Sequence, residues 1–240
     1  MKYLSFGDSK KVLVFLHGWG LSKEAFLWTK DYFDDYRKIY VDFAGFGESP
    51  EPDKVFCLSD YLTELKSLLD GFEIDKLVLV GHSFGGRVAV KFAYLYQNEY
   101  RDFKLCLVDS AGIRPRLSIA KRYKIWKYKR LNRKVDLSDG DRQKLKTMGS
   151  SDYQKLSDIM KGTFIKIVNE DLLPILKFVE CDVCLIWGQK DKETKLWMAR
   201  KMLRAFKNSE LYIFKNCGHF AYADKPREFL IILDTFIKNK

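Results

Sequence analysis

A serine stands in a sequence setting typical of nucleophilic catalysis. Ser83 lies at the centre of Gly81-His82-Ser83-Phe84-Gly85, directly after the apolar run 77–80 and before a helix-like stretch, 87–96. A G-x-S-x-G between a strand and a helix is the nucleophile elbow, a sharp turn that exposes the serine hydroxyl above a parallel sheet. Small residues are needed there because the turn is strained and the helix packs close to the strand. This setting predicts that Ser83 is a nucleophile.

A serine nucleophile at neutral pH needs a base, and the chain has only three histidines from which to choose it. His82 adjoins the serine within the elbow, where the local geometry points its side chain away from the hydroxyl. His17 begins a glycine-containing turn. His219 lies in a loop after the apolar run 211–214. We therefore expect His219 to be the base.

The acid that orients the base should end a strand between the serine and the histidine in the chain. Asp191 follows the apolar run 184–187 and a glycine turn, which is the position required for the order Ser, Asp, His. Asp109 ends another apolar run, 105–108, and is the rival candidate. Either aspartate could instead cap a turn. We favour Asp191 as the acid.

Two backbone N–H groups are expected to bind the oxyanion of a tetrahedral intermediate. One belongs to Phe84, the residue after the nucleophile. The other should come from His17-Gly18-Trp19-Gly20, a loop that follows the apolar run 12–16. Trp19 would supply its amide, and the flanking glycines would allow the backbone to approach the substrate.

The apolar runs that precede these residues alternate with amphipathic stretches. The predicted strands are 12–16, 38–43, 77–80, 105–108, 183–187 and 211–214, and the predicted helices are 58–69, 87–96, 196–206 and 226–237. Several strands are continuously apolar, which is typical of parallel strands buried on both faces. The alternation predicts an α/β fold with a mostly parallel, doubly wound sheet.

Segment 112–178 interrupts the alternation because it contains no convincing strand. Within it, Ile119, Tyr123 and Trp126 recur at helical spacing. We therefore expect a helical insertion in this segment, with the core formed by the flanking ranges 1–111 and 179–240.

The net charge of +11 is concentrated in this insertion. Arg114 to Lys134 contains ten Lys/Arg residues and no Asp or Glu, so the rest of the chain is close to neutral. A lysine-rich helix is most often a solvated face, but it could also bind an acidic partner. Tyr123, Trp126 and Tyr128 could stack on nucleic acid or contact anionic lipid. We do not favour such a binding module as the main role, because it leaves the serine, histidine and aspartate unexplained.

Composition and targeting signals are consistent with a cytoplasmic globular protein. The chain is 47% hydrophobic and 31% charged, no apolar run approaches the roughly 20 residues that span a bilayer, and the N-terminus lacks a secretory pattern. The five cysteines are scattered, which suits reduced thiols. Cys181 and Cys184 have C-x-x-C spacing, but we interpret them as strand packing because no second cysteine pair and no nearby histidine joins them.

Together these motifs make the chain similar to the α/β-hydrolase family along nearly its whole length. The resemblance rests on His17-Gly18-Trp19-Gly20, Asp42-Phe43-Ala44-Gly45-Phe46-Gly47-Glu48-Ser49, Gly81-His82-Ser83-Phe84-Gly85-Gly86, Trp187-Gly188-Gln189-Lys190-Asp191 and Gly218-His219. It implies one antiparallel edge strand, a helical cap (lid) inserted after the sixth strand, and an esterase-like mechanism through a covalent acyl-enzyme. It implies no metal and no organic cofactor.

Two narrower resemblances concern the substrate. Residues 17–21 and 209–214 are similar to those of pimeloyl-acyl-carrier-protein methyl ester esterases, which bind an acidic carrier protein over a basic lid. Residues 217–222 resemble the histidine loop of carbon–carbon hydrolases that act on ring-cleavage products.

A carboxylic ester or thioester is therefore the expected small-molecule substrate, with a carrier-protein or coenzyme A ester as one form of it. Cleavage of a carbon–carbon bond is the alternative. Gly18, His82 and Phe220 are the expected substrate-binding residues.

Overall fold

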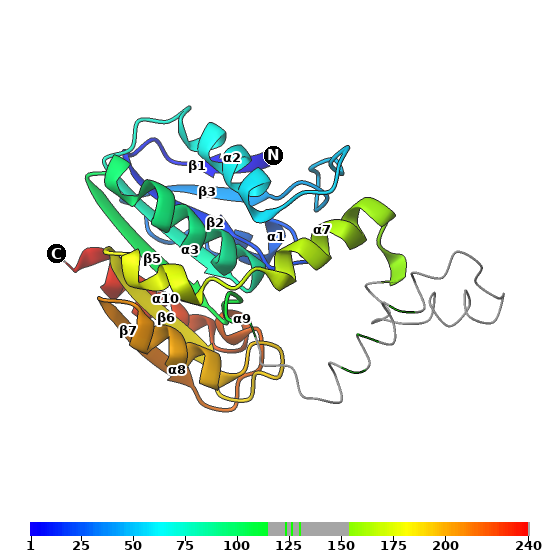
Figure 1. Ribbon diagram of the computed structural model, residues 1–240. Helices are drawn as coiled ribbons and strands as arrows, with labels where there is room; N and C mark the ends of the chain where they lie inside the picture. Colours follow the sequence, from blue (N-terminus) through cyan, green and yellow to red (C-terminus); the bar gives the residue numbers. More distant parts are fainter. Residues whose placement is uncertain (115–122, 124–125, 127–129, 131–153, 240) are drawn as a thin grey trace.

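A computed structural model describes residues 1–114, 123, 126, 130 and 154–239 (Figure 1). Within these residues, seven strands form one sheet in the order β1-β3-β2-β4-β5-β6-β7. The strands are β1 (Lys2–Phe6), β2 (Lys11–Leu16), β3 (Arg37–Asp42), β4 (Lys76–His82), β5 (Asp102–Val108), β6 (Asp182–Gly188) and β7 (Ser209–Phe214). β1 runs antiparallel to β3, and every other neighbouring pair is parallel. The predicted mostly parallel sheet with one antiparallel edge strand is confirmed.

Helices cover both faces of the sheet (Figure 1). One face carries α2 (Leu58–Leu69), α3 (Phe84–Tyr96) and α8 (Leu196–Ala205), and the other carries α1 (Glu24–Leu27), α9 (Ala221–Asp224) and α10 (Pro226–Lys238). Successive strand residues point to opposite faces, so Leu77 and Leu79 of β4 join the first layer while Val78 and Val80 join the second. Burial on both faces is the reason for the continuously apolar strands.

The six predicted strands and four predicted helices are all present, with boundaries that differ by a few residues. The largest helix difference is at α3, which begins at Phe84 and not at residue 87. Glycines in its first turn weaken the helical pattern, yet Gly85 is required there: a Cβ at this position would lie 2.1 Å from the carbonyl oxygen of Leu16 in β2. β1 was not among the predicted strands; it has no continuous apolar run, and its side chains are almost all exposed.

The insertion leaves the sheet after β5, the fifth strand, and not after the sixth, as the resemblance implied. The expected count was wrong: with the single edge strand β1 included, only five strands precede the insertion in the chain. The described part of the insertion contains α7 (Asp158–Asn169) and the short 3-10 helix η2 (Leu173–Phe178); a further 3-10 turn, η1 (Gln97–Glu99), follows α3. Met160 and Ile167 of α7 are buried against the core.

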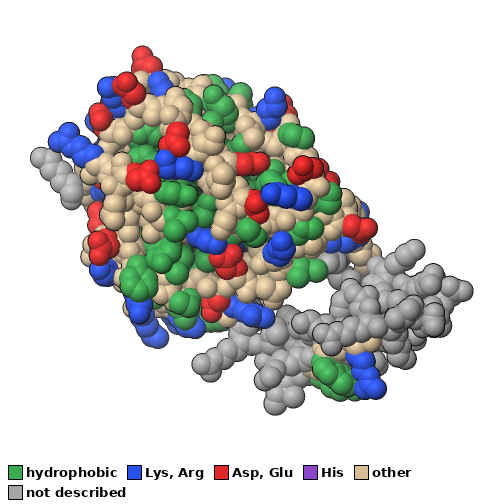
Figure 2. All heavy atoms as spheres, turned by 45° about the horizontal axis from the view of Figure 1, so that its top comes forward, with side chains coloured by type: hydrophobic (Ala, Val, Ile, Leu, Met, Phe, Trp, Pro, Cys, Tyr) green, Lys and Arg blue, Asp and Glu red, His purple; other side chains and the backbone are tan. Residues whose placement is uncertain are grey.

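Most of the basic segment Arg114 to Lys134 lies outside the described residues, including Ile119 and Tyr128. Of its described members, Tyr123 and Trp126 are exposed and their ring centroids lie 5.7 Å apart. Elsewhere, side chains of both charges are interspersed over the face drawn in Figure 2. The described positions therefore show no broad single-sign surface on this face.

Three further findings hold for the described part of the chain. None of its helices has the length and apolar character needed to cross a membrane. Its His, Cys, Asp and Glu side chains form no group of three or more that could hold a metal ion. All five cysteines are free, and Cys184 is buried within β6 opposite Cys106 of β5.

Candidate active site

Ser83 occupies the sharp turn between β4 and α3. Its φ of 50° and ψ of −109° lie outside the regions that L-residues ordinarily adopt. Such a conformation costs on the order of 1–3 kcal/mol and persists only where the surrounding structure enforces it. Here the Ser83 N–H donates to Val108 O at 3.1 Å, and the Ala111 N–H donates to Ser83 O at 3.0 Å. The end of β5 and the loop that follows it thus hold the strained turn.

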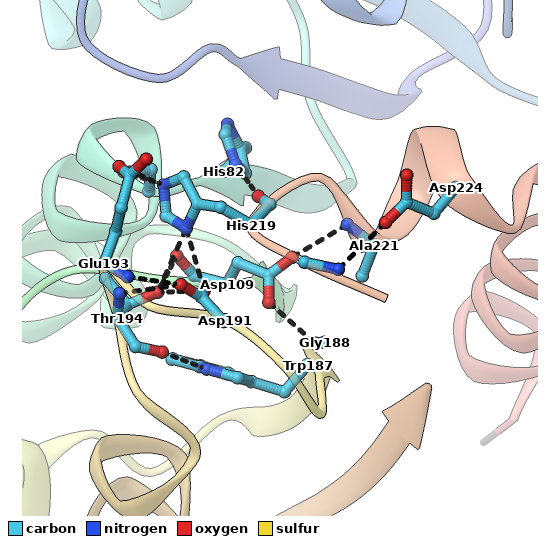
Figure 3. A network of polar contacts seen from close by, with 12 residues as sticks. His82, Asp109, Trp187, Gly188, Asp191, Glu193, Thr194, His219, Ala221 and Asp224 are labelled. Carbon is cyan, nitrogen blue, oxygen red and sulfur yellow. Dashed lines mark hydrogen bonds and ion pairs between the residues drawn. The ribbon is translucent and has the colours of Figure 1, made fainter. Parts of the chain in front are cut away.

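Polar contacts connect Ser83, His219 and Asp191 in one line. Ser83 Oγ lies 3.0 Å from His219 Nε2, and His219 Nδ1 lies 2.8 Å from Asp191 Oδ2. Figure 3 shows the imidazole directed at the aspartate. The three residues follow β4, β7 and β6. Because these strands are parallel, their carboxyl ends meet at one edge of the sheet, which brings together residues that are distant in sequence.

The electrostatics of the pair suit a base held by an acid. Burial alone would lower the pKa of His219, but its hydrogen bond to Asp191 and the nearby carboxylates hold that pKa above its ordinary value. Burial would likewise raise the pKa of Asp191, but hydrogen bonds from His219 and Thr194 hold it below its ordinary value. The aspartate is therefore ionised at neutral pH and favours protonation of the imidazole.

Asp191 is itself held by the loop that follows it. Its Oδ1 accepts from the backbone N–H groups of Glu193 (2.7 Å) and Thr194 (3.0 Å). Its Oδ2 accepts from the Thr194 hydroxyl at 2.6 Å in addition to His219. Sequence reasoning missed Thr194. The signal was the spacing Asp-x-x-Thr after a glycine turn, where an aspartate commonly caps the following amides.

The carboxylate of Asp109, the rival acid, forms its hydrogen bonds with backbone N–H groups and not with the His219 ring. Its Oδ1 accepts from Gly188 N at 2.7 Å and its Oδ2 from Ala221 N at 3.0 Å (Figure 3). It is fully buried, and burial raises its pKa to about 7 against these two hydrogen bonds. Asp109 thus joins the end of β6, which leads to Asp191, to the loop that carries His219.

Two other histidines lie beneath the site as neutral structural groups. His82 donates from Nε2 to the backbone oxygen of His219 at 2.7 Å, while burial lowers its pKa to about 3. His17 donates from Nδ1 to Gly18 O at 2.7 Å and accepts at Nε2 from Phe43 N at 3.1 Å, and burial lowers its pKa to about 4. His82 thus supports the histidine loop and His17 supports the glycine loop.

Trp19 and Phe84 offer backbone N–H groups on two sides of the elbow. Neither N–H has a hydrogen-bond acceptor among the described residues. That of Phe84 is free because the first amides of a helix have no partner within the helix. The Trp19 ring packs edge-on against the rings of Phe46, Phe84 and Phe164 at centroid distances of 4.9, 5.5 and 5.1 Å. This packing holds the glycine loop over the elbow.

A cavity of about 640 Å³ opens above Ser83 and His219. Its described lining includes the three expected substrate-binding residues Gly18, His82 and Phe220. Trp19 and Phe84 line it from the core, and Phe164, Ile167 and Val168 line it from α7. The volume is within the range of small-molecule sites.

A match to a protein family shows the family of the chain. Residues 13–231 match the family model described as alpha/beta hydrolase family. The chain belongs to the alpha/beta hydrolase family. The sheet order, the strained turn at Ser83 and the position of the histidine loop after the last strand agree with this membership.

Two relatives of this hydrolase are distant in sequence but match it over most of their length. AB hydrolase superfamily protein YisY of Bacillus subtilis is 24% identical, covering 93% of this chain and 90% of that protein. A 2-hydroxy-6-oxo-2,4-heptadienoate hydrolase of Pseudomonas putida is 21% identical, covering 84% and 78%. The solved structure of an esterase from Exiguobacterium antarcticum is 21% identical with a TM-score of 0.75, covering 99% of this chain and 95% of that one. At this identity the structural likeness supports the fold.

Proposed function

We propose that this hydrolase cleaves a carboxylic ester or thioester through an acyl-enzyme formed on Ser83. The observation that carries the proposal is the uninterrupted line from Ser83 Oγ to His219 Nε2 (3.0 Å) and from His219 Nδ1 to Asp191 Oδ2 (2.8 Å) at the floor of a cavity. A hydroxyl, an imidazole and a carboxylate in this sequence of contacts are the requirements of nucleophilic acyl transfer.

The groups of the site act in turn in the proposed reaction. Ser83 Oγ attacks the substrate carbonyl and transfers its proton to His219 Nε2, while Asp191 stabilises the imidazolium. The N–H groups of Trp19 and Phe84 donate to the oxyanion. His219 then protonates the departing alcohol or thiol, which leaves an acyl ester on Ser83. A water molecule, deprotonated by His219, attacks this ester and releases the acid with Ser83 restored.

We further propose that residues 112–178 form a cap over a core made of 1–111 and 179–240. The support is that α7 lies across the cavity from the elbow: Phe164, Ile167 and Val168 line the same space as Ser83. A cap in this position would set the size of the acyl group and limit the access of water.

A second candidate is hydrolysis of a carbon–carbon bond in a ring-cleavage product. It is favoured by the similarity to the Pseudomonas putida 2-hydroxy-6-oxo-2,4-heptadienoate hydrolase over 84% of this chain. A carrier-protein ester remains a prediction from the basic segment, most of which, including Arg122 and Lys124, lies outside the described residues. The alternative of a binding module depends on the same segment. It gives no role to the contacts that connect Ser83, His219 and Asp191.

Turnover of p-nitrophenyl esters from acetate to dodecanoate, together with labelling by a fluorophosphonate, tests the proposal. We expect Ser83-dependent hydrolysis that is greatest at one chain length, because the walls of the cavity bound the acyl group. We also expect a fluorophosphonate to label Ser83. Absence of both turnover and labelling would refute a serine hydrolase. Labelling without turnover of any of these esters would point to a selective substrate, such as a carrier-protein ester or a ring-cleavage product, and each of these is then tested directly.

The acid side of the pH profile should depend on Glu193. Its carboxylate lies 3.3 Å from His219 Nε2 and contributes to the raised pKa of that imidazole. Catalysis needs neutral His219, so kcat/KM should rise with pH through a pKa above the ordinary histidine value. Glu193→Gln removes a charge that favours the protonated form, so the rise should move to lower pH.

Measurement of kcat/KM between pH 4 and 9 at low and high salt checks this expectation. Because the Glu193 side chain is 69% exposed, salt should weaken its effect and reduce the difference between the two proteins. An identical profile for wild type and Glu193→Gln at low salt would show that Glu193 does not act on the base.

A further inference from the structure

Arg87 is a buried cation in the wall of the cavity. It lies one helical turn beyond the nucleophile on α3, where its N–H donates to Ser83 O at 3.3 Å. The residue is only 5% exposed, yet it lines the cavity that holds Ser83 and His219. Ser83 and Arg87 thus border the same space, into which a short chain attached at Ser83 would extend.

No carboxylate of the described residues lies within ion-pair distance of Arg87. Its Nη1 donates to the backbone oxygen of Glu170, at the end of α7. The carboxylate of Glu170 instead pairs with Lys91, at 2.6 Å. The nearby Asp171 carboxylate accepts from the N–H of Arg114 at 3.2 Å. Both acidic side chains next to Arg87 are therefore bound to other groups.

A guanidinium has five N–H donors. Burying this cation costs free energy unless a carboxylate or other acceptor binds it. The described contacts use only one of its nitrogens, Nη1, and none of the Arg87 nitrogens is both fully buried and unbonded. The others therefore keep some access to solvent, and Arg87 is one of the residues that line the cavity. Burial lowers the pKa of Arg87 to about 10, so the side chain remains cationic at neutral pH.

The surroundings of Arg87 in the cavity are mostly apolar. Trp19, Leu156, Phe164, Ile167 and Val168 line it together with the cation. Such a space suits a hydrocarbon chain that ends in an anion. Two further charged groups line the cavity: Lys155 adds positive charge, and Glu193 lies on the side of His219.

We propose that Arg87 binds a carboxylate at the far end of the acyl group, so that the substrate is a half-ester or half-thioester of a short dicarboxylic acid. The inference rests on the proposed function, because it assumes that the acyl group is the one attached to Ser83. A carboxylate offers two oxygens to the planar guanidinium and can accept from two of its N–H groups at once.

Binding of glutarate and pentanoate to the Ser83→Ala protein tests the site without any turnover. The two ligands have the same chain length, and only glutarate carries the distal carboxylate. We expect calorimetry to show tighter binding of glutarate, and Arg87→Met in the same background to weaken glutarate by roughly 10- to 100-fold, the size of a lost hydrogen bond between charged groups. Pentanoate should be nearly unaffected.

Lys91→Met is the matched control. It removes a cation one turn further along α3 that bonds the same residue, Glu170, but does not line the cavity. We expect it to leave the preference for glutarate unchanged and Arg87→Lys to restore part of it. Equal weakening of both ligands by Arg87→Met would show a structural role and overturn the proposal. Equal binding of glutarate and pentanoate by the Ser83→Ala protein would also overturn the proposal. This result does not depend on whether the Arg87→Met protein folds.

Kinetics with the Ser83-containing enzyme separates this inference from the proposed function. We expect a higher kcat/KM for mono-p-nitrophenyl glutarate than for p-nitrophenyl pentanoate, and a reversal of this order in Arg87→Met. Ser83-dependent hydrolysis of both esters with equal kcat/KM would overturn the carboxylate site but would still support the proposed hydrolase function. If glutarate binding depends on Arg87 but neither ester is hydrolysed, the carboxylate site is supported and the proposed esterase function is contradicted.

Discussion

Ser83→Ala is expected to lower kcat for ester hydrolysis by about 10⁶-fold, the scale seen when the nucleophile of a serine hydrolase is removed. The reason is that no other group of the described site can form the acyl-enzyme. His219 Nε2 lies 3.0 Å from Ser83 Oγ, and its other contact among the described residues is the Glu193 carboxylate and not a second hydroxyl. Steady-state hydrolysis of the best p-nitrophenyl ester, with active-site titration by a fluorophosphonate, measures the loss.

The substitution should leave the fold intact. Alanine retains the Cβ and the same backbone strain at φ 50°, and the bonds that hold the turn are backbone bonds to Val108 and Ala111. Unchanged circular dichroism and thermal midpoint are therefore the control. Retention of more than a few per cent of activity would mean that Ser83 is not the nucleophile.

Asp191→Asn should cost about 10⁴-fold in kcat, by analogy with triad aspartates elsewhere. An asparagine can keep the loop, because its oxygen accepts from the N–H groups of Glu193 and Thr194 as Oδ1 does now. Its NH₂ group then faces His219 Nδ1 and donates to it. The imidazole must carry its own proton on Nε2 and can no longer accept one from Ser83. The measurement is kcat with the same ester, alongside the thermal midpoint.

Asp109→Asn is the matched comparison, because Asp109 was the rival acid. Both of its oxygens accept backbone N–H groups, from Gly188 and Ala221, and an asparagine can satisfy only one of them. We expect a loss of stability of about 1–3 kcal/mol, typical of an unpaired buried polar group, with a much smaller loss of kcat than in Asp191→Asn. The reverse order, with Asp109→Asn the crippling change and Asp191→Asn mild, would move the acid to Asp109.

Asp109 and Asp191 both follow apolar strands, and this shared position explains why the sequence alone did not settle which of them is the acid. Each follows an apolar strand between Ser83 and His219 in the chain. The glycine turn before Asp191 favoured that residue, but the pattern does not show which carboxylate faces the imidazole. That choice depends on the turns after the strands. Asp109 has φ 44° and its carboxylate meets two backbone amides, whereas the loop after β6 returns Asp191 to Nδ1 of His219.

Other parts of the site were beyond sequence patterns because they depend on long-range packing. Arg87 reads as an ordinary polar residue of an amphipathic helix, and only the placement of α7 and η2 over α3 buries it beside the nucleophile. Similarly, the adjacency of His82 to the serine gave no hint that it bonds the backbone of His219, 137 residues away.

By itself the sequence determined the alternation of buried strands and helices, the strained serine turn, and the loops that carry His219, Asp191 and Trp19. These features are local, since they follow from apolar periodicity and from glycines at turns. The tertiary structure alone decided that the Asp191 carboxylate meets the imidazole, that His17 and His82 lie buried beneath the site, and that Arg87 is buried with no carboxylate of the described residues at ion-pair distance. Those outcomes depend on how strand ends and helices from distant segments meet, and no spacing within one segment encodes that arrangement.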